Sequence, residues 1–458
     1  MIRIDVLPDD VLLEIFDFCV DMTPSSERKT VIEAWQLLVH VCRRWRSLVF
    51  GSPRRLNLRL FCTPGTPAKD TLDVWPALPL LIWADMFLSS CMDNIIVTLK
   101  QSNRVFQVNL SGFGDRHLEN VLAAMQVPFP ELELLRLSSY DAQPVIPDSF
   151  LGGSAPHLRT LELDGIPFPG LPKLLLSAPH LFHLDLSNIP HSGYISPEAM
   201  AALLSMLSNI ETLALEFQSP QSRPNWESRR PPPPKRSVIP ALNRFHFNGA
   251  IEYLDDLVSH IDAPQLDHLF ISFFNQIDVD SPRLAQFISR TPILRDCDAH
   301  ASVEFYDSFV TVGLPCHFRD SAIEISCREP VWQLSSIAQV CKSCLPPLSM
   351  IEYLYVERQF PTLAWTNDAI EVTLWLELLR PFLAVKDLYL SKDFAPGIAA
   401  ALQEIVGTEV LPSLQSIFVE GLEASGPFQE DIGQFVAARE LSGHPITISF
   451  WNGLGPHM

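Results

Sequence analysis

The chain lacks any long apolar run and is poor in basic residues. Its longest apolar stretch, ALPLLIWA at residues 77–84, ends at Asp85, far short of the roughly 18 residues that a membrane-spanning helix requires. Lys and Arg number 33 against 53 Asp and Glu, which gives a formal net charge of −20. A surface of this charge repels the phosphates of nucleic acids. The composition therefore predicts no membrane partner and no nucleic-acid partner.

The motifs of common catalytic and cofactor sites are also absent from the sequence. It contains no Gly-rich phosphate loop, no G-x-S-x-G and no H-E-x-x-H. Cys341 and Cys344 form a lone C-x-x-C, whereas a zinc site requires a second pair of ligands. The other cysteines are scattered, which is typical of reduced, buried thiols. We therefore expect no catalytic residue, no metal and no cofactor, and a cytoplasmic and/or nuclear location.

After residue 60 a six-residue pattern recurs, with apolar residues at its first, fourth and sixth positions. LRTLEL at 158–163 and LFHLDL at 181–186 are clear copies, whereas LRDCDA at 294–299 and AIEISC at 322–327 are degenerate. The mean spacing of about 28 residues lies within the range of leucine-rich repeats. The copies begin at Leu78, Val105, Leu132, Leu158, Leu181, Ile210, Leu242, Leu266, Leu294, Ala322, Ile351, Val385 and Leu414.

The repeats predict an α/β fold over residues 61–458. Alternation within each copy is typical of a strand, and several intervals between copies have helical spacing. Strand followed by helix, repeated, builds a leucine-rich-repeat-like solenoid with a parallel sheet on its concave face and helices on its convex face. We expect ITISFW at 446–451 to be the final edge strand. The helical stretches are 117–125, 196–207 and 368–382.

Residues 1–60 predict a small helical domain. The apolar residues of PDDVLLEIFDFC recur at helical spacing, and the same holds for VIEAWQLLVHVCRRWRSLVF at 31–50. These segments resemble the F-box, whose features are a Leu-Pro start, an apolar first helix and a Val-Cys-Arg-x-Trp-Arg segment. The overall layout and the segment FVAARELSGHPITISFW resemble the large F-box families of mushroom-forming fungi. The matching residues are Leu7-Pro8, Ile15-Phe16 and Val41-Cys42-Arg43-Arg44-Trp45-Arg46.

The resemblance implies a substrate-recognition subunit of a Skp–cullin–F-box type ubiquitin ligase. The F-box would bind a Skp-type adaptor, and through it a cullin, while the solenoid would capture a target protein. The arginines would flank the docking patch and meet acids on the partner or solvent. The opposing interpretation is that Phe16, Trp35 and Trp45 form a core that joins the helices to the solenoid. The implied adaptor-binding residues are Leu7, Pro8, Ile15, Phe16, Val39, Cys42 and Trp45.

The residue four places after each start is expected to face away from the solenoid core, on the concave side. The predicted column is acidic early and aromatic late, and we expect it to bind a protein segment with apolar and basic residues. Alternatively, the C-terminal tail with Phe450 and Trp451 folds over the aromatic rings. The column is Ile82, Asn109, Arg136, Glu162, Asp185, Ala214, His246, Phe270, Asp298, Ser326, Tyr355, Tyr389 and Phe418. The substrate-binding candidates are Glu162, Asp164, Asp185, His246, Phe270, Tyr353, Tyr355, Tyr389 and Phe418.

A proline-rich basic segment at 219–237, SPQSRPNWESRRPPPPKRS, interrupts the repeats. Four successive prolines cannot continue a helix or donate to a sheet, so the segment predicts an exposed loop. It is either a solvated insertion, a nuclear-import signal or a ligand for a proline-reading domain. For the whole chain, two other interpretations stay open. One is a leucine-rich-repeat scaffold that binds proteins without recruiting a ligase, and the other is an enzyme with unrecognised active-site residues.

Overall fold

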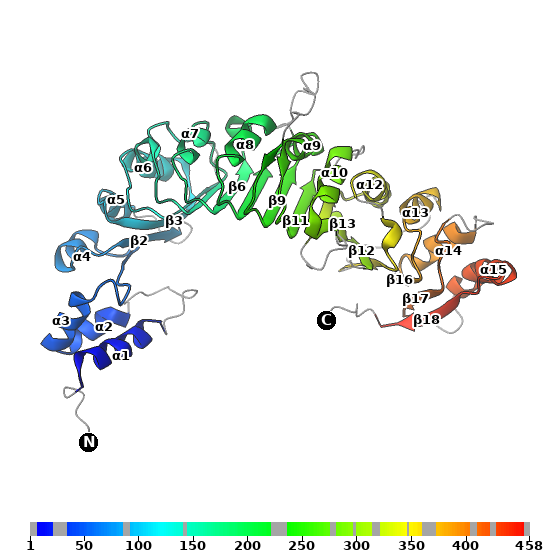
Figure 1. Ribbon diagram of the computed structural model, residues 1–458, viewed down its shortest axis with the longest axis horizontal. Helices are drawn as coiled ribbons and strands as arrows, with labels where there is room; N and C mark the ends of the chain where they lie inside the picture. The colour runs from blue at the N-terminus through cyan, green and yellow to red at the C-terminus, as the bar shows by residue number, and fades with distance from the viewer. Residues whose placement is uncertain are drawn as a thin grey trace. The chain divides into compact units, whose positions relative to one another are not determined.

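The computed structural model describes most of the chain (Figure 1). The chain divides into two compact units. Unit 1 is Met1–Leu184 and unit 2 is Asp185–Met458. Each unit is a mixed α/β structure. The described residues are 7–21, 34–85, 92–140, 144–220, 236–274, 281–295, 299–313, 321–345, 348–359, 372–403, 410–421 and 427–452.

Unit 1 begins with three helices that pack against one another and continues with strands that alternate with short helices. Its strands β1 to β5 form parallel neighbours in chain order. The helices are α1 (Asp9–Asp21), α2 (Ala34–Val41), α3 (Arg43–Gly51), α4 (Ala68–Val74), α5 (Asp93–Leu99), α6 (Asp115–Ala124), the 3-10 turn η2 (Phe150–Gly153) and α7 (Leu171–Leu175). The strands are β1 (Leu60–Cys62), β2 (Leu80–Asp85), β3 (Val105–Phe113), β4 (Leu134–Ser139) and β5 (Thr160–Asp164).

The segment at 31–50, expected as one helix, is broken at Cys42. Cys42 has an extended backbone (φ −158°, ψ 170°) and caps α3, with its Sγ accepting a hydrogen bond from the Trp45 backbone N–H. A side chain that accepts from the first turn satisfies a donor that has no partner inside the helix. The apolar spacing continues across this cap, and for that reason the spacing did not reveal the break.

Unit 2 repeats the alternation of strands with helices on a larger scale. Its strands are β6 (His183–Ile189), which begins two residues before the boundary, β7 (Thr212–Phe217), β8 (Ser237–Val238), β9 (Arg244–Gly249), β10 (Ile261–Asp262), β11 (His268–Phe273), β12 (His300–Phe305), β13 (Phe309–Gly313), β14 (Ala322–Ser326), β15 (Tyr353–Arg358), β16 (Asp387–Leu390), β17 (Ser416–Glu420) and β18 (Thr447–Trp451). Its helices are η3 (His191–Gly193), α8 (Pro197–Leu204), α9 (Ile251–His260), α10 (Pro282–Arg290), α11 (Pro292–Arg295), α12 (Pro330–Ser343), η5 (Leu348–Met350), α13 (Val372–Leu379), α14 (Ala395–Gln403) and α15 (Pro427–Leu441).

The strands of unit 2 form one sheet in the order β6-β7-β9-β11-β14-β13-β12-β15-β16-β17-β18, with β8 and β10 paired apart from it. Among the described strands of this sheet, β13 alone pairs antiparallel, and it does so with both β12 and β14. The copy predicted at Leu294 is wrong, because residues 292–295 are helix α11 and the next strand begins at His300. The copy AIEISC at 322–327 is a strand, but Ala322, not Ser326, lies beside Phe270.

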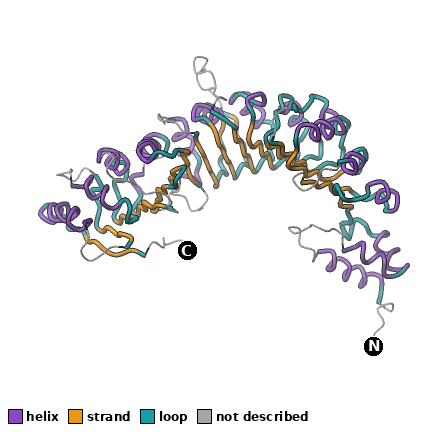
Figure 2. Tube along the Cα trace, turned by 180° about the vertical axis from the view of Figure 1, so that it is seen from behind, coloured by secondary structure: helices purple, strands orange, loops and turns teal. Residues whose placement is uncertain are grey.

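One face of each sheet packs against the helices and the other face does not (Figure 2). Along β15, for example, Leu354 and Val356 are fully buried, whereas Tyr353 and Glu357 are half-buried. Successive side chains of a strand point to opposite faces, so the fully buried set faces the helices and forms the core. We call the other side the open face. A register shift in β2 places Trp83, rather than the predicted Ile82, beside Asn109 on that face.

The large, mostly parallel sheets are compatible with the predicted leucine-rich-repeat-like solenoid. Most copies of the repeat coincide with strands, and the expected edge strand is β18. The expected helix start at Ser196 is confirmed, since its hydroxyl accepts a hydrogen bond from the Ala199 N–H at 3.3 Å. A separate domain over residues 1–60 stays a prediction, and most of the proline-rich segment at 219–237 lies outside the described residues.

Candidate interaction surfaces

Helix α1 presents apolar side chains on two sides. Leu12 and Phe16 are fully buried and hold the helix to its neighbours. Val11, Ile15 and Phe18 are exposed, and 67% of Phe18 is open to solvent. Positions 11, 15 and 18 follow the i, i+4, i+7 spacing of one helix face. The exposed stripe therefore lies beside the buried one, and the described part of the chain leaves it open to solvent.

Helix α2 shows the same division. Trp35 and Val39 are buried, whereas Leu37 and Val41, four residues apart, are each 58% exposed. Trp35 donates from Nε1 to the carbonyl oxygen of Arg59 at 3.1 Å and stands edge-on to Trp75, with ring centroids 5.2 Å apart. Trp35 thus joins α2 to the segment that leads into the repeats. This contact matches the alternative in which Trp35 is a core residue.

The implied adaptor-binding residues fall into two groups. Phe16 and Val39 are buried in the chain's own core, so their assignment to direct contact with a partner is corrected. Ile15, Pro8 and Cys42 are exposed, and Leu7 and Trp45 are half-buried. The ring of Trp45 packs on Phe16 with centroids 4.8 Å apart. The residues that sequence reasoning missed are Val11, Phe18, Leu37 and Val41, although the helical period places each beside a predicted position.

Two of the three arginines of VCRRWR bind within the chain. Arg44 donates from Nε to the Asp9 carboxylate at 3.0 Å and from Nη2 to the Leu7 carbonyl at 2.6 Å. Arg46 donates from Nε to the Val39 carbonyl at 3.0 Å. The expectation that these arginines meet acids on a partner or solvent is therefore corrected. They tie α3 to the start of α1 and to the end of α2.

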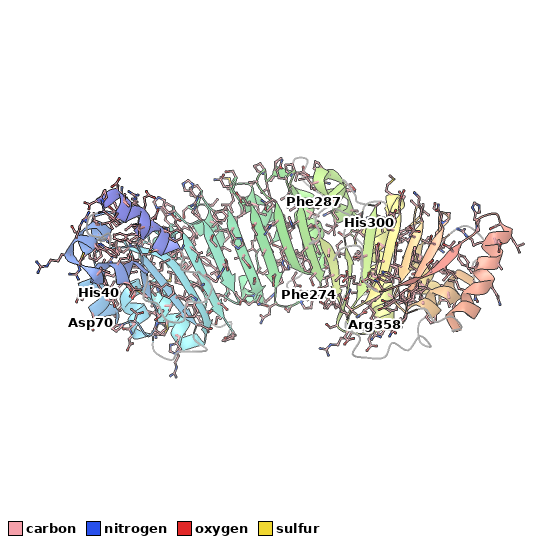
Figure 3. All side chains as sticks on the ribbon, turned by 90° about the horizontal axis from the view of Figure 1, so that it is seen from below. His40, Asp70, Phe274, Phe287, His300 and Arg358 are labelled. Carbon is pink, nitrogen blue, oxygen red and sulfur yellow. The ribbon has the colours of Figure 1, made fainter. Side chains whose placement is uncertain are left out.

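A stack of aromatic rings crosses the open face of unit 2. Tyr355, Tyr389 and Phe418 are register partners on β15, β16 and β17. Tyr355 and Tyr389 have centroids 4.3 Å apart at 14°, and Tyr389 and Phe418 have centroids 4.6 Å apart at 8°. At the start of β15, Tyr353 stacks on His300 of β12 at 4.5 Å. Figure 3 labels His300 and Arg358 at opposite ends of this strand pair. The sequence thus predicted the row correctly, but not its close stacking.

The rings of the stack shield one another from solvent, and the C-terminal strand β18 covers part of the stack. Tyr355 is only 5% exposed, which corrects the expectation that its ring is freely available. Trp451 of β18 is buried with its ring against Tyr355 and Tyr389. Phe450, in contrast, is 61% exposed and lies on the other side of the strand. The alternative of a tail over the rings therefore holds for Trp451 alone.

A row of carboxylates lies next to the aromatic stack, on the same face of the sheet. Glu304 of β12 lies directly beside Glu357 of β15. Burial raises the pKa of the Glu357 carboxyl to about 7, with the charges of Glu304 and Glu420 adding to the shift. Sequence reasoning missed Glu357 because it lies two places after Tyr355 of the column, and it missed Glu304 because the repeat copy at Leu294 did not locate β12.

The predicted acidic residues form ion pairs or hydrogen bonds within the chain. In unit 1 the Arg136 guanidinium forms an ion pair with Glu162, and Ser138 donates to Asp164 at 2.8 Å. In unit 2 the Ser187 hydroxyl donates to Asp185. The expected acidic patch is thus partly neutralised, and its members belong to different units. His246 and Phe270, predicted between the two ends, are ring neighbours at 4.8 Å.

Other chemistry has little support in the part of the chain that the structure describes. Cys341 and Cys344 are buried as expected, and burial raises the pKa of the Cys341 thiol. Within the described ranges, no cluster of three or more His, Cys, Asp or Glu side chains could hold a metal ion. The same residues include no helix long and apolar enough to cross a membrane.

The solved structures that match the chain include a leucine-rich repeat-containing protein. No family model and no curated protein matches the chain. The leucine-rich repeat-containing protein LegL7 from Legionella pneumophila is 15% identical, with 84% of this chain and 98% of that chain covered. Its TM-score of 0.28 is too low to support an argument about fold or function.

Proposed function

We propose that the chain is the substrate-recognition subunit of a Skp–cullin–F-box type ubiquitin ligase. Helices α1 to α3 bind a Skp-type adaptor, and the repeats that follow bind the target protein. The proposal combines the F-box resemblance of residues 7–46 with the exposed apolar side chains of α1 and α2. It assigns no catalytic chemistry to this chain, since ubiquitin transfer belongs to partner proteins.

The observation that carries the proposal is the exposed stripe of Val11, Ile15 and Phe18. Scattered exposed apolar side chains are ordinary, whereas a stripe on one helix face is typical of a surface that a partner covers. Aromatic side chains contribute much of the energy of protein interfaces, so we assign Phe18 as the main anchor. Leu37 and Val41 on α2 supply further apolar surface.

The open face of the repeats supports the second half of the proposal. Parallel strands bring side chains from distant parts of the sequence into rows, which suits the binding of an extended protein surface. A protein-binding scaffold without ligase recruitment is the coarser form of this proposal. The two differ only in what α1 and α2 bind.

The test is capture of a purified Skp-type adaptor by the full chain. Phe18→Asp and Leu37→Asp should each weaken capture by at least about tenfold, because a charge would be buried in the interface. The control is Val74→Asp on α4, an apolar side chain that is 73% exposed outside this surface, and it should capture the adaptor normally. Circular dichroism of all three variants checks that each of them is folded.

Unchanged capture by both Phe18→Asp and Leu37→Asp would overturn the assigned surface. If the wild-type chain captures no adaptor but still binds cargo, the scaffold function replaces the ligase function.

A further inference from the structure

The open face of unit 2 carries negative charge beside its aromatic stack. We use the name acidic–aromatic strip for Glu304, Glu357, Glu420, Tyr355, Tyr389 and Phe418. Glu304 and Glu357 are direct register partners, and Ser302 and Tyr355 pair two residues earlier on the same strands. Glu420 follows Phe418 by two residues on β17 and therefore shares its face. The carboxylates and the rings form adjacent rows.

Like charges placed directly opposite each other destabilise a sheet. Here two hydrogen bonds hold the carboxylates in place, with Tyr306 donating to Glu304 at 2.9 Å and Gln359 donating to Glu357 at 3.2 Å. No Lys or Arg among the described residues forms an ion pair with Glu304, Glu357 or Glu420. No cation among the described residues therefore neutralises the carboxylates of the strip.

Two other carboxylates, in or next to the sheet strands, are paired with cations of their own chain. Glu162 pairs with Arg136 in unit 1, and Glu352 pairs with Lys386 at 2.7 Å in unit 2. Within the described part of unit 2, the strip has no Lys or Arg paired with its carboxylates, although it lies on the same kind of surface. A partner cation would provide what Arg136 and Lys386 provide elsewhere.

The rings restrict which cation would suit the strip. Each face of Tyr389 is covered by a neighbouring ring, so the stack presents ring edges and hydroxyl groups rather than open faces. The half-buried edges of Tyr389 and Phe418 suit the methylene stem of a long cationic side chain. The described residues offer no site for a single metal ion, so charges on flexible stems match the strip better.

We propose that the acidic–aromatic strip docks a segment of the target protein that bears Lys or Arg side chains. The charged groups lie at Glu304, Glu357 and Glu420, and the stems lie along Tyr389 and Phe418. The proposal rests on the cargo-binding half of the proposed function and does not depend on the adaptor-binding half. Charge complementarity is its main support.

The test uses the full chain and a fluorescein-labelled peptide, GKAKAKAKG, in an anisotropy titration. The matched probe GQAQAQAQG has the same length without the charge. We expect the lysine peptide to bind at least about tenfold more tightly than the glutamine peptide, a difference of about 1.4 kcal/mol at 25 °C. The double variant Glu304→Gln/Glu357→Gln should lose that difference.

The control variant removes the same charge elsewhere in unit 2. Glu377 of α13 and Glu440 of α15 are exposed on helices, so Glu377→Gln/Glu440→Gln reports non-specific attraction to an acidic chain. It should bind the lysine peptide as the wild type does. The proposal would be overturned if both double variants lost the same affinity for the lysine peptide. It would also be overturned if the wild type bound the lysine and glutamine peptides equally.

A pH titration adds a second readout. A bound cation favours the ionised form of Glu357, so the affinity for the lysine peptide should rise between pH 6 and 8. The groups facing Glu357 are Glu304, Glu420, Tyr306 and Gln359, and Lys in the peptide stays charged throughout this range. The rise should be absent in Glu357→Gln, and its persistence there would contradict the assignment.

Adaptor capture is measured on the same preparations. If the adaptor is captured but the lysine peptide shows no preference for the strip, only this inference fails. If the peptide binds at the strip but no adaptor is captured, only the recruitment half of the proposed function fails.

Discussion

The ring of Trp451 stands edge-on against the ring of Tyr389, with centroids 5.6 Å apart and planes at 70°. Trp451 lies near the end of the described chain, on a strand with β17 as its neighbour in the sheet. Contacts of the Trp451 ring with Tyr389 and Tyr355 thus anchor the last strand to the aromatic stack. The stack in turn depends on that strand for part of its cover.

Replacing Trp451 should destabilise the C-terminal end of unit 2. We expect Trp451→Ala to cost about 3–5 kcal/mol, the usual range for a buried Trp. The neighbouring Phe450→Ala is the control, because Phe450 is mostly exposed and a surface change costs within about 0.5 kcal/mol. Hydrogen exchange of the β17 and β18 amides is the measurement. Equal protection in the two variants would refute the role of Trp451.

Stability should depend on pH through Glu357. Its pKa of about 7 lies above that of an unfolded glutamate, so the folded state holds more protons between roughly pH 4.5 and 7. The stabilisation is therefore present below that range and is lost as pH rises through 7. Urea denaturation at pH 5 and pH 8 should show that Glu357→Gln gains stability relative to the wild type at the higher pH. The prediction is contradicted if the stability difference between Glu357→Gln and the wild type is the same at pH 5 and pH 8.

Gly165 follows β5 and requires a backbone that other residues rarely adopt. Its φ is +70°, and a Cβ there would overlap the carbonyl oxygen of Ser139. Gly165→Ala should cost more than the roughly 1–2 kcal/mol of the left-handed conformation alone. Gly433 in α15 has open space around it and no such φ, so Gly433→Ala should stabilise by about 0.5–1 kcal/mol. Thermal denaturation of both variants checks the opposite signs.

The cap at Cys42 can be strengthened. Serine is a preferred helix N-cap, whereas alanine offers no acceptor, and the two differ by about 1 kcal/mol. Cys42→Ser should therefore raise the melting temperature above that of the wild type, and Cys42→Ala should lower it. An alanine variant as stable as the wild type would show that the Sγ hydrogen bond from Trp45 contributes nothing.

The sequence was most informative where one period dominates. Period-2 alternation located strands such as β15 and β16, and register then placed Tyr355, Tyr389 and Phe418 in a row as expected. Periodicity could not reveal that α11 occupies the expected copy at Leu294, because short apolar segments suit helix and strand alike. It also could not separate Phe16, which is buried, from Phe18, which is exposed, since that distinction depends on how the helices pack.

The pairing of Glu304 with Glu357 was beyond prediction for a different reason. It depends on β12 lying next to β15, and β13 and β14 separate these strands in the sequence. A linear repeat would have placed β14 there. The candidate site therefore became visible only with the strand order.

The strand order β11-β14-β13-β12-β15 also has a consequence for assembly of the chain. In a simple repeat array each new strand extends the growing edge, so folding can follow synthesis. Here β12 is synthesised before β13 and β14, the strands that lie between it and β11 in the sheet. The part of the sheet that ends at β11 can join the part that begins at β12 only after β13 and β14 have been added. We therefore expect β12, β13 and β14 to fold cooperatively, and a chain truncated within β13 or β14 would leave one edge of β11 unpaired.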